Sequence, residues 1–241
     1  GIQWISALCY LDDVVVFGQS FDESIERLAE VFRRFRKANL KLKPQKCHLL
    51  KREVLYLGFK VSGDGVQVNP ALVKDILDWP VPQNVTQLQS FLGTTSYFRR
   101  WIPGFAGVAS PLYALTKKKV PFVWEQEHTV AFEKLKGYLV SPPIMAHPIP
   151  GYTFILDTDA SSAAVGCVLL QEQPNSQGEL VERVIGYSSF HLDAQQRKYC
   201  TTRLELLAIV RGTRAYRHYL LGAPFLIRTD HGSLAWLMRF K

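Results

Sequence analysis

The stretch ISALCYLDDVVVFG, residues 5–18, places two adjacent carboxylates, Asp12 and Asp13, inside an apolar run rich in β-branched residues. A run of this kind is typical of a buried strand or hairpin. Carboxylates within it cost free energy unless positive charge meets them. One interpretation is a turn between two strands, because Asp is a common turn residue. The other is a site for divalent cations, and the rest of the chain decides between them.

The composition predicts folded domains. Of the 241 residues, 47% are apolar and 12% aromatic, which suits one large domain or two to three small ones. No apolar run approaches the ~18 residues of a membrane span, and the start does not resemble a signal peptide. The four cysteines lack a C-x-x-C spacing, which argues against a zinc site or disulfide scaffold and favours reduced thiols in an intracellular compartment. The chain opens inside a strand without a Met, so we expect a fragment of a longer protein.

Positive charge is concentrated in one part of the chain. The net charge is +8, and residues 33–60 contain ten basic residues against one acid, Glu53. A basic field of this kind suits a polyanion such as nucleic acid. A solvated basic surface is the alternative interpretation of the same stretch.

The first block of the chain, residues 1–68, reads as strands around one helix. The hairpin leads into a helix whose start, Ser20 to Glu23, fits the S-x-x-E capping box. After the basic stretch, EVLYLGFKVS (53–62) and GVQVNP (65–70) read as two short strands that form a hairpin. We therefore predict antiparallel strands with a helix in this block.

The second block, residues 69–150, reads as helical. A capping-box match at Thr86 to Gln89 predicts the start of one of its helices. The proline-rich link from Ser141 to Gly151 is the strongest candidate for a domain boundary.

The third block, residues 151–241, alternates strands with helix. We expect a long helix from about Gln195 to Leu221, with Gly222 as its stop, and a final helix in GSLAWLMRF. Four strands are predicted, at residues 152–159, 164–173, 180–189 and 224–230.

This third block carries acids in unusual places. Asp157 and Asp159 end the first strand, Glu205 interrupts an apolar helical run, and Asp230 ends the fourth strand. Each alone has an ordinary explanation as a turn, cap or solvated residue. Together they can converge on one edge of a β-β-β-α-β sheet, where carboxylates repel one another unless cations lie between them. Mg²⁺ prefers such oxygen ligands, and two ions stabilise an in-line displacement at phosphorus.

These motifs resemble the Pol polyprotein of a gypsy-type LTR retrotransposon, retrovirus-related, over nearly all of the chain. The resemblance implies an α+β and α/β multidomain fold: part of a reverse transcriptase palm in 1–68, with its primer-grip hairpin; thumb and linking helices in 69–150; and a C-terminally truncated RNase H-like mixed sheet with helices in 151–241. Nine motifs occur in the expected order: YLDD, KLKPQKC, YLGFKVS, FLGTTSYFRRWIPGFAGVASPL, FVWEQEHTVAFEKLKGYL, ILDTDASSAAVG, LELLAIV, YRHYLLG and RTDHGSLAWL.

The resemblance also implies roles for particular residues. Asp12 and Asp13 match the polymerase metal site, with Asp12 favoured as the direct ligand, and a further metal-binding Asp is expected before Gly1. In the RNase H-like block a fourth acid is expected beyond Lys241, and Asp157 is a neighbour of the ligands. The catalytic and metal-binding acids of that block are Asp159, Glu205 and Asp230, and the residues implied in nucleic-acid binding are Lys46, Leu57, Gly58, Arg99 and Arg100.

The function implied is RNA-directed DNA polymerase with ribonuclease H activity, incomplete in this fragment. Such an enzyme copies RNA into DNA and cleaves RNA in RNA–DNA hybrids with two Mg²⁺ per site, or Mn²⁺ in their place. Its partners are an RNA template, a DNA primer, RNA–DNA hybrid and deoxynucleoside triphosphates, with a homodimer or the rest of Pol as a protein partner and no membrane. Its location is intracellular, in a cytoplasmic virus-like particle or the nucleus. The alternatives are a domesticated or inactive retroelement protein that binds nucleic acid without catalysis, and a pseudogene product without a role.

Overall fold

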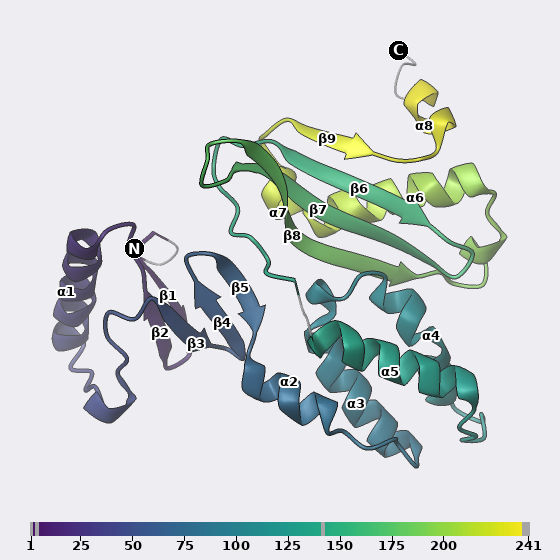
Figure 1. Ribbon diagram of the computed structural model, residues 1–241, viewed down its shortest axis with the longest axis horizontal. Coiled ribbons are helices and arrows are strands. Elements are labelled where there is room, and N and C mark those ends of the chain that lie inside the picture. Colours follow the sequence, from purple (N-terminus) through teal and green to yellow (C-terminus); the bar gives the residue numbers. More distant parts are fainter. Residues whose placement is uncertain (1, 3–4, 141–142, 238–241) are drawn as a thin grey trace. The chain divides into compact units, whose positions relative to one another are not determined.

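The computed structural model describes residues 2, 5–140 and 143–237 (Figure 1). The chain forms two compact units, Gly1–Gly63 and Asp64–Lys241. None of the helices in the described part of the chain is long and apolar enough to cross a membrane.

The first unit combines two antiparallel hairpins with one long helix, and the first hairpin and the helix agree with the prediction. In the first hairpin Ala7 lies opposite Val16 and Tyr10 lies opposite Asp13. The elements are β1 (Ala7–Tyr10), β2 (Asp13–Val16), α1 (Phe21–Lys37), a 3₁₀ turn η1 (Pro44–Lys46), β3 (Glu53–Tyr56) and β4 (Phe59–Ser62).

The capping box predicted for the first helix is confirmed. Ser20 is the N-cap of α1, and its hydroxyl accepts a hydrogen bond from the backbone N–H of Glu23 at 3.2 Å. The Glu23 carboxylate accepts in return from the N–H of Gln19. These bonds satisfy donors that the first helical turn leaves without partners.

The segment EVLYLGFKVS is a hairpin by itself, and the prediction of a single strand there is wrong. Glu53 lies opposite Ser62, and Tyr56 lies opposite Phe59. Leu57 and Gly58 form the turn, with φ angles of 51° and 79°. A two-residue loop of this kind needs positive φ at both positions to match the twist of the strands. Leu is a rare residue for that conformation, so the sequence carries only half of the usual turn signal.

The helical part of the second unit follows one short strand and is built on aromatic packing. Phe91 is fully buried and its ring lies 4.5 Å from that of Phe132 and 5.8 Å from that of Trp79. The elements are β5 (Gly65–Val68), α2 (Pro70–Leu77), α3 (Val85–Tyr97), a 3₁₀ turn η2 (Arg99–Trp101), α4 (Phe105–Leu115) and α5 (Gln126–Val140).

The N-cap of α3 lies two residues before the predicted one. Asn84 is the N-cap and accepts from the N–H of Gln87 at 2.9 Å, and the Gln87 side chain accepts from the N–H of Gln83 at 2.8 Å. The prediction of Thr86 and Gln89 as the capping pair is therefore wrong. Both pairs fit the spacing, and Asn is the better N-cap residue.

The rest of the second unit is a four-stranded mixed sheet in the order β8-β7-β6-β9, with α6 along one face (Figure 1). Only β6 and β9 pair in parallel. The core beneath α6 contains Leu156, Leu169 and Ile185, and Gly212 lets the helix approach Cys167 closely. The elements are β6 (Phe154–Ala160), β7 (Ala164–Pro174), β8 (Leu180–His191), a 3₁₀ turn η3 (Gln196–Lys198), α6 (Thr201–Ala215), α7 (Arg217–Leu220), β9 (Phe225–Arg228) and α8 (Gly232–Leu237).

The long helix predicted from Gln195 to Leu221 is divided into three pieces. The side chain of Asp193 accepts from the N–H groups of Gln195 and Gln196, so it closes a separate 3₁₀ turn before α6. At the other end, α6 stops at Ala215 and a short helix follows. The start of the last predicted helix is confirmed by α8, whose continuation past residue 237 lies outside the described residues.

The predicted link, Ser141 to Gly151, lies inside the second unit. Ser141 and Pro142 are outside the described residues, but the rest of the link is held by the fold. Met145 pairs with Val66 of β5, and the Ala146 N–H donates to Val184 of β8. The division into blocks at 68 and 150 remains a prediction.

We expect Gly65→Ala to destabilise the second unit. Gly65 has a φ of 140°, and an added Cβ would lie 2.2 Å from the carbonyl oxygen of Met145. The backbone conformation alone costs about 1–3 kcal/mol for a residue with a side chain, so the free energy of unfolding should fall by at least that amount in urea titrations. Gly63→Ala is the matched control, because an added Cβ there meets no atom within 4 Å. Equal stability of the two variants would contradict this account.

Candidate functional site

Three acids from separate elements of the second unit lie at one edge of the sheet. Asp159 is near the end of β6, and Asp230 follows β9. Because β6 and β9 are parallel with Asp157 opposite Arg228, both chains leave the sheet side by side at this edge. Glu205 reaches it from α6 and is buried, with 4% of its surface exposed.

The electrostatics of Glu205 place the other two acids close to it. Burial raises the pKa of the Glu205 carboxyl, and the negative charges of Asp230 and Asp159 raise it further. The positive charge of His231 and a hydrogen bond from the backbone N–H of Ala160 act in the opposite direction. One oxygen of Glu205, Oε2, is buried without a hydrogen-bond partner among the described residues. A buried carboxylate oxygen without a donor is costly and needs a positive partner.

The donor set of this cluster suits a hard divalent cation. Carboxylate oxygens are the ligands that Mg²⁺ prefers, and Glu205 supplies one that no group in the described part of the chain satisfies. Within the described ranges, however, no three His, Cys, Asp or Glu side chains are grouped closely enough to hold a metal ion as they stand. Three carboxylates repel one another, so a separation wider than a ligand sphere is the expected arrangement without a cation.

His231 is a member of this site that the sequence analysis did not identify. Its Nε2 lies 2.8 Å from the hydroxyl of Thr202 in the first turn of α6, one turn before Glu205. The backbone N–H of His231 also donates to the Thr229 hydroxyl. These bonds connect the segment that carries Asp230 to the helix that carries Glu205. The position of His231 directly after an acid at a strand end was the available signal.

Asp157 is used for a structural ion pair instead. Its two oxygens accept from Arg228 on β9 at 2.6 and 2.8 Å, and the same guanidinium binds Glu182 of β8 at 2.7 and 2.9 Å. This hydrogen bonding lowers the pKa of Glu182. The expectation that Asp157 stands apart from the ligands agrees with these contacts.

The YLDD motif forms the tip of the first hairpin. Leu11 and Asp12 make the turn, Asp13 begins β2, and both aspartates are exposed. Leu11 has a φ of 53°, a conformation that few residues with a side chain adopt. The pKa of Tyr56 on β3 is raised by burial and by nearby Cys9 and Asp13. The hairpin tip is therefore a turn that leaves both carboxylates accessible, and the cation-site interpretation stays a prediction.

The remaining predicted site residues occupy two environments. Lys46 is exposed in η1, and Leu57 and Gly58 form the β3–β4 turn. Arg99 donates from its guanidinium to the carbonyl oxygen of Ser189 on β8 at 2.7 Å. The Arg100 guanidinium lies 3.5 Å from where a Cβ on Gly186 of β8 would be. Both arginines thus contact the sheet, and their nucleic-acid role stays a prediction.

Two segments of the chain match known protein families. Residues 3–61 match the reverse transcriptase (RNA-dependent DNA polymerase) family. Residues 124–227 match the RNase H-like domain found in reverse transcriptase.

Among curated proteins, the chain is similar to transposon polyproteins over nearly its whole length. It is 39% identical over 235 residues to the retrovirus-related Pol polyprotein from transposon 297 of Drosophila melanogaster, covering 97% of this chain and 21% of that protein. It is 33% identical over 229 residues to the Transposon Tf2-3 polyprotein of Schizosaccharomyces pombe, covering 94% of this chain and 17% of that protein. The chain thus spans about a fifth of the length of these relatives.

The fold is that of solved reverse transcriptases. The foamy viral protease-reverse transcriptase dRH in complex with double-stranded DNA superposes with a TM-score of 0.82 at 22% identity, over 98% of this chain and 41% of that chain. The foamy viral enzyme in complex with RNA/DNA hybrid gives a TM-score of 0.78 at 22% identity, over 92% and 30%. These likenesses confirm the predicted fold class of antiparallel strands with a helix, thumb-like helices and a mixed sheet with helices.

The buried acid predicts how the stability of the second unit depends on pH. Because the pKa of Glu205 is raised above its usual 4.5 in the folded chain, the folded state holds the proton more tightly than the unfolded state. The free energy of unfolding should therefore fall as pH rises from below 4.5 through the raised pKa, and stay lower above it. Thermal melts in metal-free buffer measure this, since about 1 kcal/mol shifts Tm by about 2–4 °C.

Either a substitution of Glu205 or the addition of Mg²⁺ should remove this pH dependence of the free energy of unfolding. Glu205→Gln takes away the titrating group, and Mg²⁺ neutralises the cluster at neutral pH. Glu26→Gln, at an exposed position of α1, serves as the control and should melt like the parent. A Glu205→Gln variant that keeps the full pH dependence would show that other groups cause it.

Proposed function

We propose that this chain is a segment of the Pol polyprotein of a gypsy-type LTR retrotransposon. In this proposal residues 1–68 are the later part of a reverse transcriptase palm, residues 69–150 the thumb and linking helices, and residues 151–241 an RNase H-like domain. The order of the two family matches and the similarity to transposon polyproteins over 94–97% of the chain support it.

The nuclease part of the proposal is carried by one observation: Glu205 has a buried oxygen without a partner among the described residues, and the charges of Asp159 and Asp230 act on the same carboxyl. These three acids would hold two Mg²⁺, or Mn²⁺, at the sheet edge. When bound, the two ions supply an activated water and stabilise the leaving oxygen of a phosphodiester. Glu205 is fixed by its burial and by the N–H of Ala160, so it would be the buried ligand of the site. Asp159 lies on the exposed side, where it can meet a substrate.

The substrate proposed for this site is the RNA strand of an RNA–DNA hybrid. The foamy viral reverse transcriptase with the same fold was solved in complex with such a hybrid. His231 and Thr202 would keep Asp230 and Glu205 at a constant separation while a hybrid binds. A domesticated protein that binds nucleic acid without cleavage is the alternative, and it predicts hybrid binding without RNA products.

The polymerase part of the proposal places Asp12 and Asp13 in a metal site that copies RNA into DNA from a primer and deoxynucleoside triphosphates. The exposed hairpin tip supports this assignment, because both carboxylates can meet ions and nucleotide there. A further Asp, expected upstream of Gly1, would complete the site. Lys46 would lie near the leaving pyrophosphate, and the positive-φ turn at Leu57 and Gly58 would bring backbone close to the primer end.

The setting of the protein follows from the same proposal. Its nucleic-acid partners are an RNA template, a DNA primer and their hybrid, and its protein partner is a second copy or the rest of Pol. It acts inside the cell, in a virus-like particle of the cytoplasm or in the nucleus.

The nuclease is tested by incubating this chain, and the longer polyprotein, with an end-labelled RNA–DNA hybrid and Mg²⁺. We expect RNA products from the parent and a loss of at least about 100-fold in Glu205→Gln, because removing a group that positions transition-state charge costs about that much or more. Glu26→Gln should cleave at the parental rate. Binding of hybrid by both proteins without any RNA product would support the non-catalytic alternative.

The polymerase is tested in the longer polyprotein with primed RNA. Asp12→Asn removes a charge but preserves side-chain size, so primer extension should be lost while primer–template binding changes little. Asp22→Asn, at an exposed position in the first turn of α1, is the control for a lost carboxylate in the same unit and should extend normally. Normal extension by Asp12→Asn would reduce YLDD to a structural turn.

A further inference from the structure

Three cations from distant parts of the second unit gather at the end of β8. Arg99 belongs to η2, Lys117 follows α4, and Arg197 belongs to η3. Arg99 and Arg197 bind the backbone on either side of His191, the last residue of β8, and the charge of Lys117 also acts on His191. We name Arg99, Lys117 and Arg197 the β8 cation cluster.

Hydrogen bonds fix two of the three cations to the backbone at this strand end. Arg99 donates to the carbonyl oxygen of Ser189 at 2.7 Å, and Arg197 donates through Nε to that of Leu192 at 3.2 Å. Each bond uses one of the five N–H donors of a guanidinium. The other N–H donors of each guanidinium are therefore held in place and are not used by its bond to the backbone.

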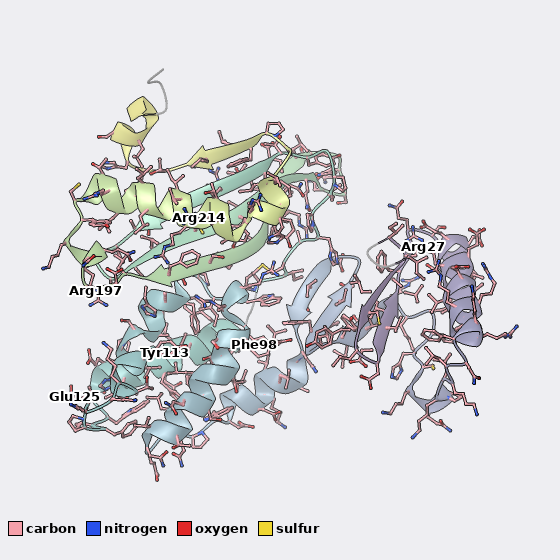
Figure 2. The ribbon with its side chains drawn as sticks, turned by 180° about the vertical axis from the view of Figure 1, so that it is seen from behind. Arg27, Phe98, Tyr113, Glu125, Arg197 and Arg214 are labelled. Carbon is pink, nitrogen blue, oxygen red and sulfur yellow. The ribbon has the colours of Figure 1, made fainter. Side chains whose placement is uncertain are left out.

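The ring of His191 connects the third cation to this group. Its centroid lies 5.8 Å from that of Tyr113 on α4, and Lys117 comes four residues after Tyr113 (Arg197 and Tyr113 are labelled in Figure 2). Burial lowers the pKa of His191, and so do the positive charges of Arg197, Arg99 and Lys117, in that order. The ring contact and these charges associate Lys117 with the strand end that Arg99 and Arg197 bind.

The cluster lacks the carboxylate partners that other arginines of the described residues have, and the Arg99 guanidinium lies instead 5.5 Å from the centre of the Phe105 ring. Elsewhere, Arg27, Arg34 and Arg228 form ion pairs with carboxylates. Within the described residues, none of the three cluster cations does so. The neighbouring acid Asp193 is engaged by the N–H groups that close η3. An exposed, fixed and unbalanced group of cations is suited to a phosphate-bearing partner.

The strand register relates the cluster to the acids. Asp159 lies opposite Gly166 on β7, which lies opposite Ser189 on β8. Two strand spacings of about 4.8 Å put the backbones of Asp159 and Ser189 about 10 Å apart. One strand of a duplex has a phosphate for about every 3.4 Å of helix axis. The strand end that holds the cluster therefore lies about three phosphate spacings from the backbone of Asp159.

We propose that the β8 cation cluster is a phosphate-backbone site for the RNA–DNA hybrid, which grips the duplex about three nucleotides away from the phosphate at Asp159, Glu205 and Asp230. The inference rests on the proposed nuclease function, because that function defines the second point of attachment. Since Arg99 and Lys117 come from the helical part and Arg197 from the sheet part, the hybrid would bind both parts at once.

The test measures hybrid binding without cleavage. In a Glu205→Gln background without Mg²⁺, the affinity for a short RNA–DNA hybrid is measured from about 50 to 200 mM salt. Loss of two phosphate contacts in Lys117→Gln/Arg197→Gln should reduce the log–log slope by about 1.8, at about 0.9 per contact. The matched control, Lys74→Gln/Lys134→Gln, removes the same charge from exposed positions of α2 and α5 and should keep the parental slope.

A single substitution distinguishes a lost phosphate contact from a loss of folding, because its Tm is measured together with its salt slope. Lys117→Gln changes an exposed side chain, so it should reduce the slope by about 0.9 with an unchanged Tm. Equal slopes for the cluster and control variants would overturn the proposal. A slope change seen with double-stranded DNA but not with hybrid would overturn the assignment of the partner.

The nuclease proposal is read out separately. With Glu205 intact and Mg²⁺ present, Lys117→Gln/Arg197→Gln should cleave with a raised KM and a nearly unchanged kcat, because the cluster binds away from the reacting phosphate. If the parent binds hybrid with the expected slope but never cleaves it, the nuclease proposal fails and the binding site stands. If the parent cleaves and the cluster variant has the parental KM and slope, the binding site fails and the nuclease stands.

Discussion

The parallel pairing of β6 with β9 determines where the acids of the second unit lie. Once Asp157 is opposite Arg228, Asp159 near the end of β6 and Asp230 just after β9 lie at the same end of the sheet. The fork of Arg228 between Asp157 and Glu182 reinforces this register, since a bidentate guanidinium needs both carboxylates in defined places. Packing of α6 on the sheet then brings Glu205 to the same edge.

The cost of that arrangement explains the character of the site. A buried acid beside two others destabilises the charged form of the folded chain, and residues without any catalytic chemistry compensate for it. The N–H of Ala160 and the bond between His231 and Thr202 hold the backbone segments where repulsion would separate them. A cluster of this kind costs stability, which is typical of functional sites.

Strong local signals in the sequence predicted the elements well, and competition between similar signals caused the errors. Ser20 was identified correctly as an N-cap. At α3 the capping-box pattern fits both Asn84 and Thr86, and the prediction named Thr86, whereas the N-cap is Asn84. The turn at Leu57 could not be recognised, because tertiary pairing imposes a conformation that Leu disfavours. The resemblance named Asp159, and not Asp157, as a ligand. The ion pair of Asp157 with Arg228 on β9 gives a physical reason why Asp157 stands apart. Contacts of Arg99 with β8 join segments 90 residues apart, which no local pattern reports.

Two buried glutamines on β7 bear on how the molecule can be dissected. The side chain of Gln171 donates to the carbonyls of Ile149 and Tyr152 and accepts from the N–H of Ile149, while Gln173 donates to the carbonyl of His147. A truncation that starts the sheet part at residue 151 would leave both amides buried without several of these partners, at about 1–3 kcal/mol for each unsatisfied group. The segment from His147 to Tyr152 is therefore attached to β7 by these side-chain hydrogen bonds and belongs to the sheet part. A stable minimal fragment of that part has to carry it, and protease treatment should spare it.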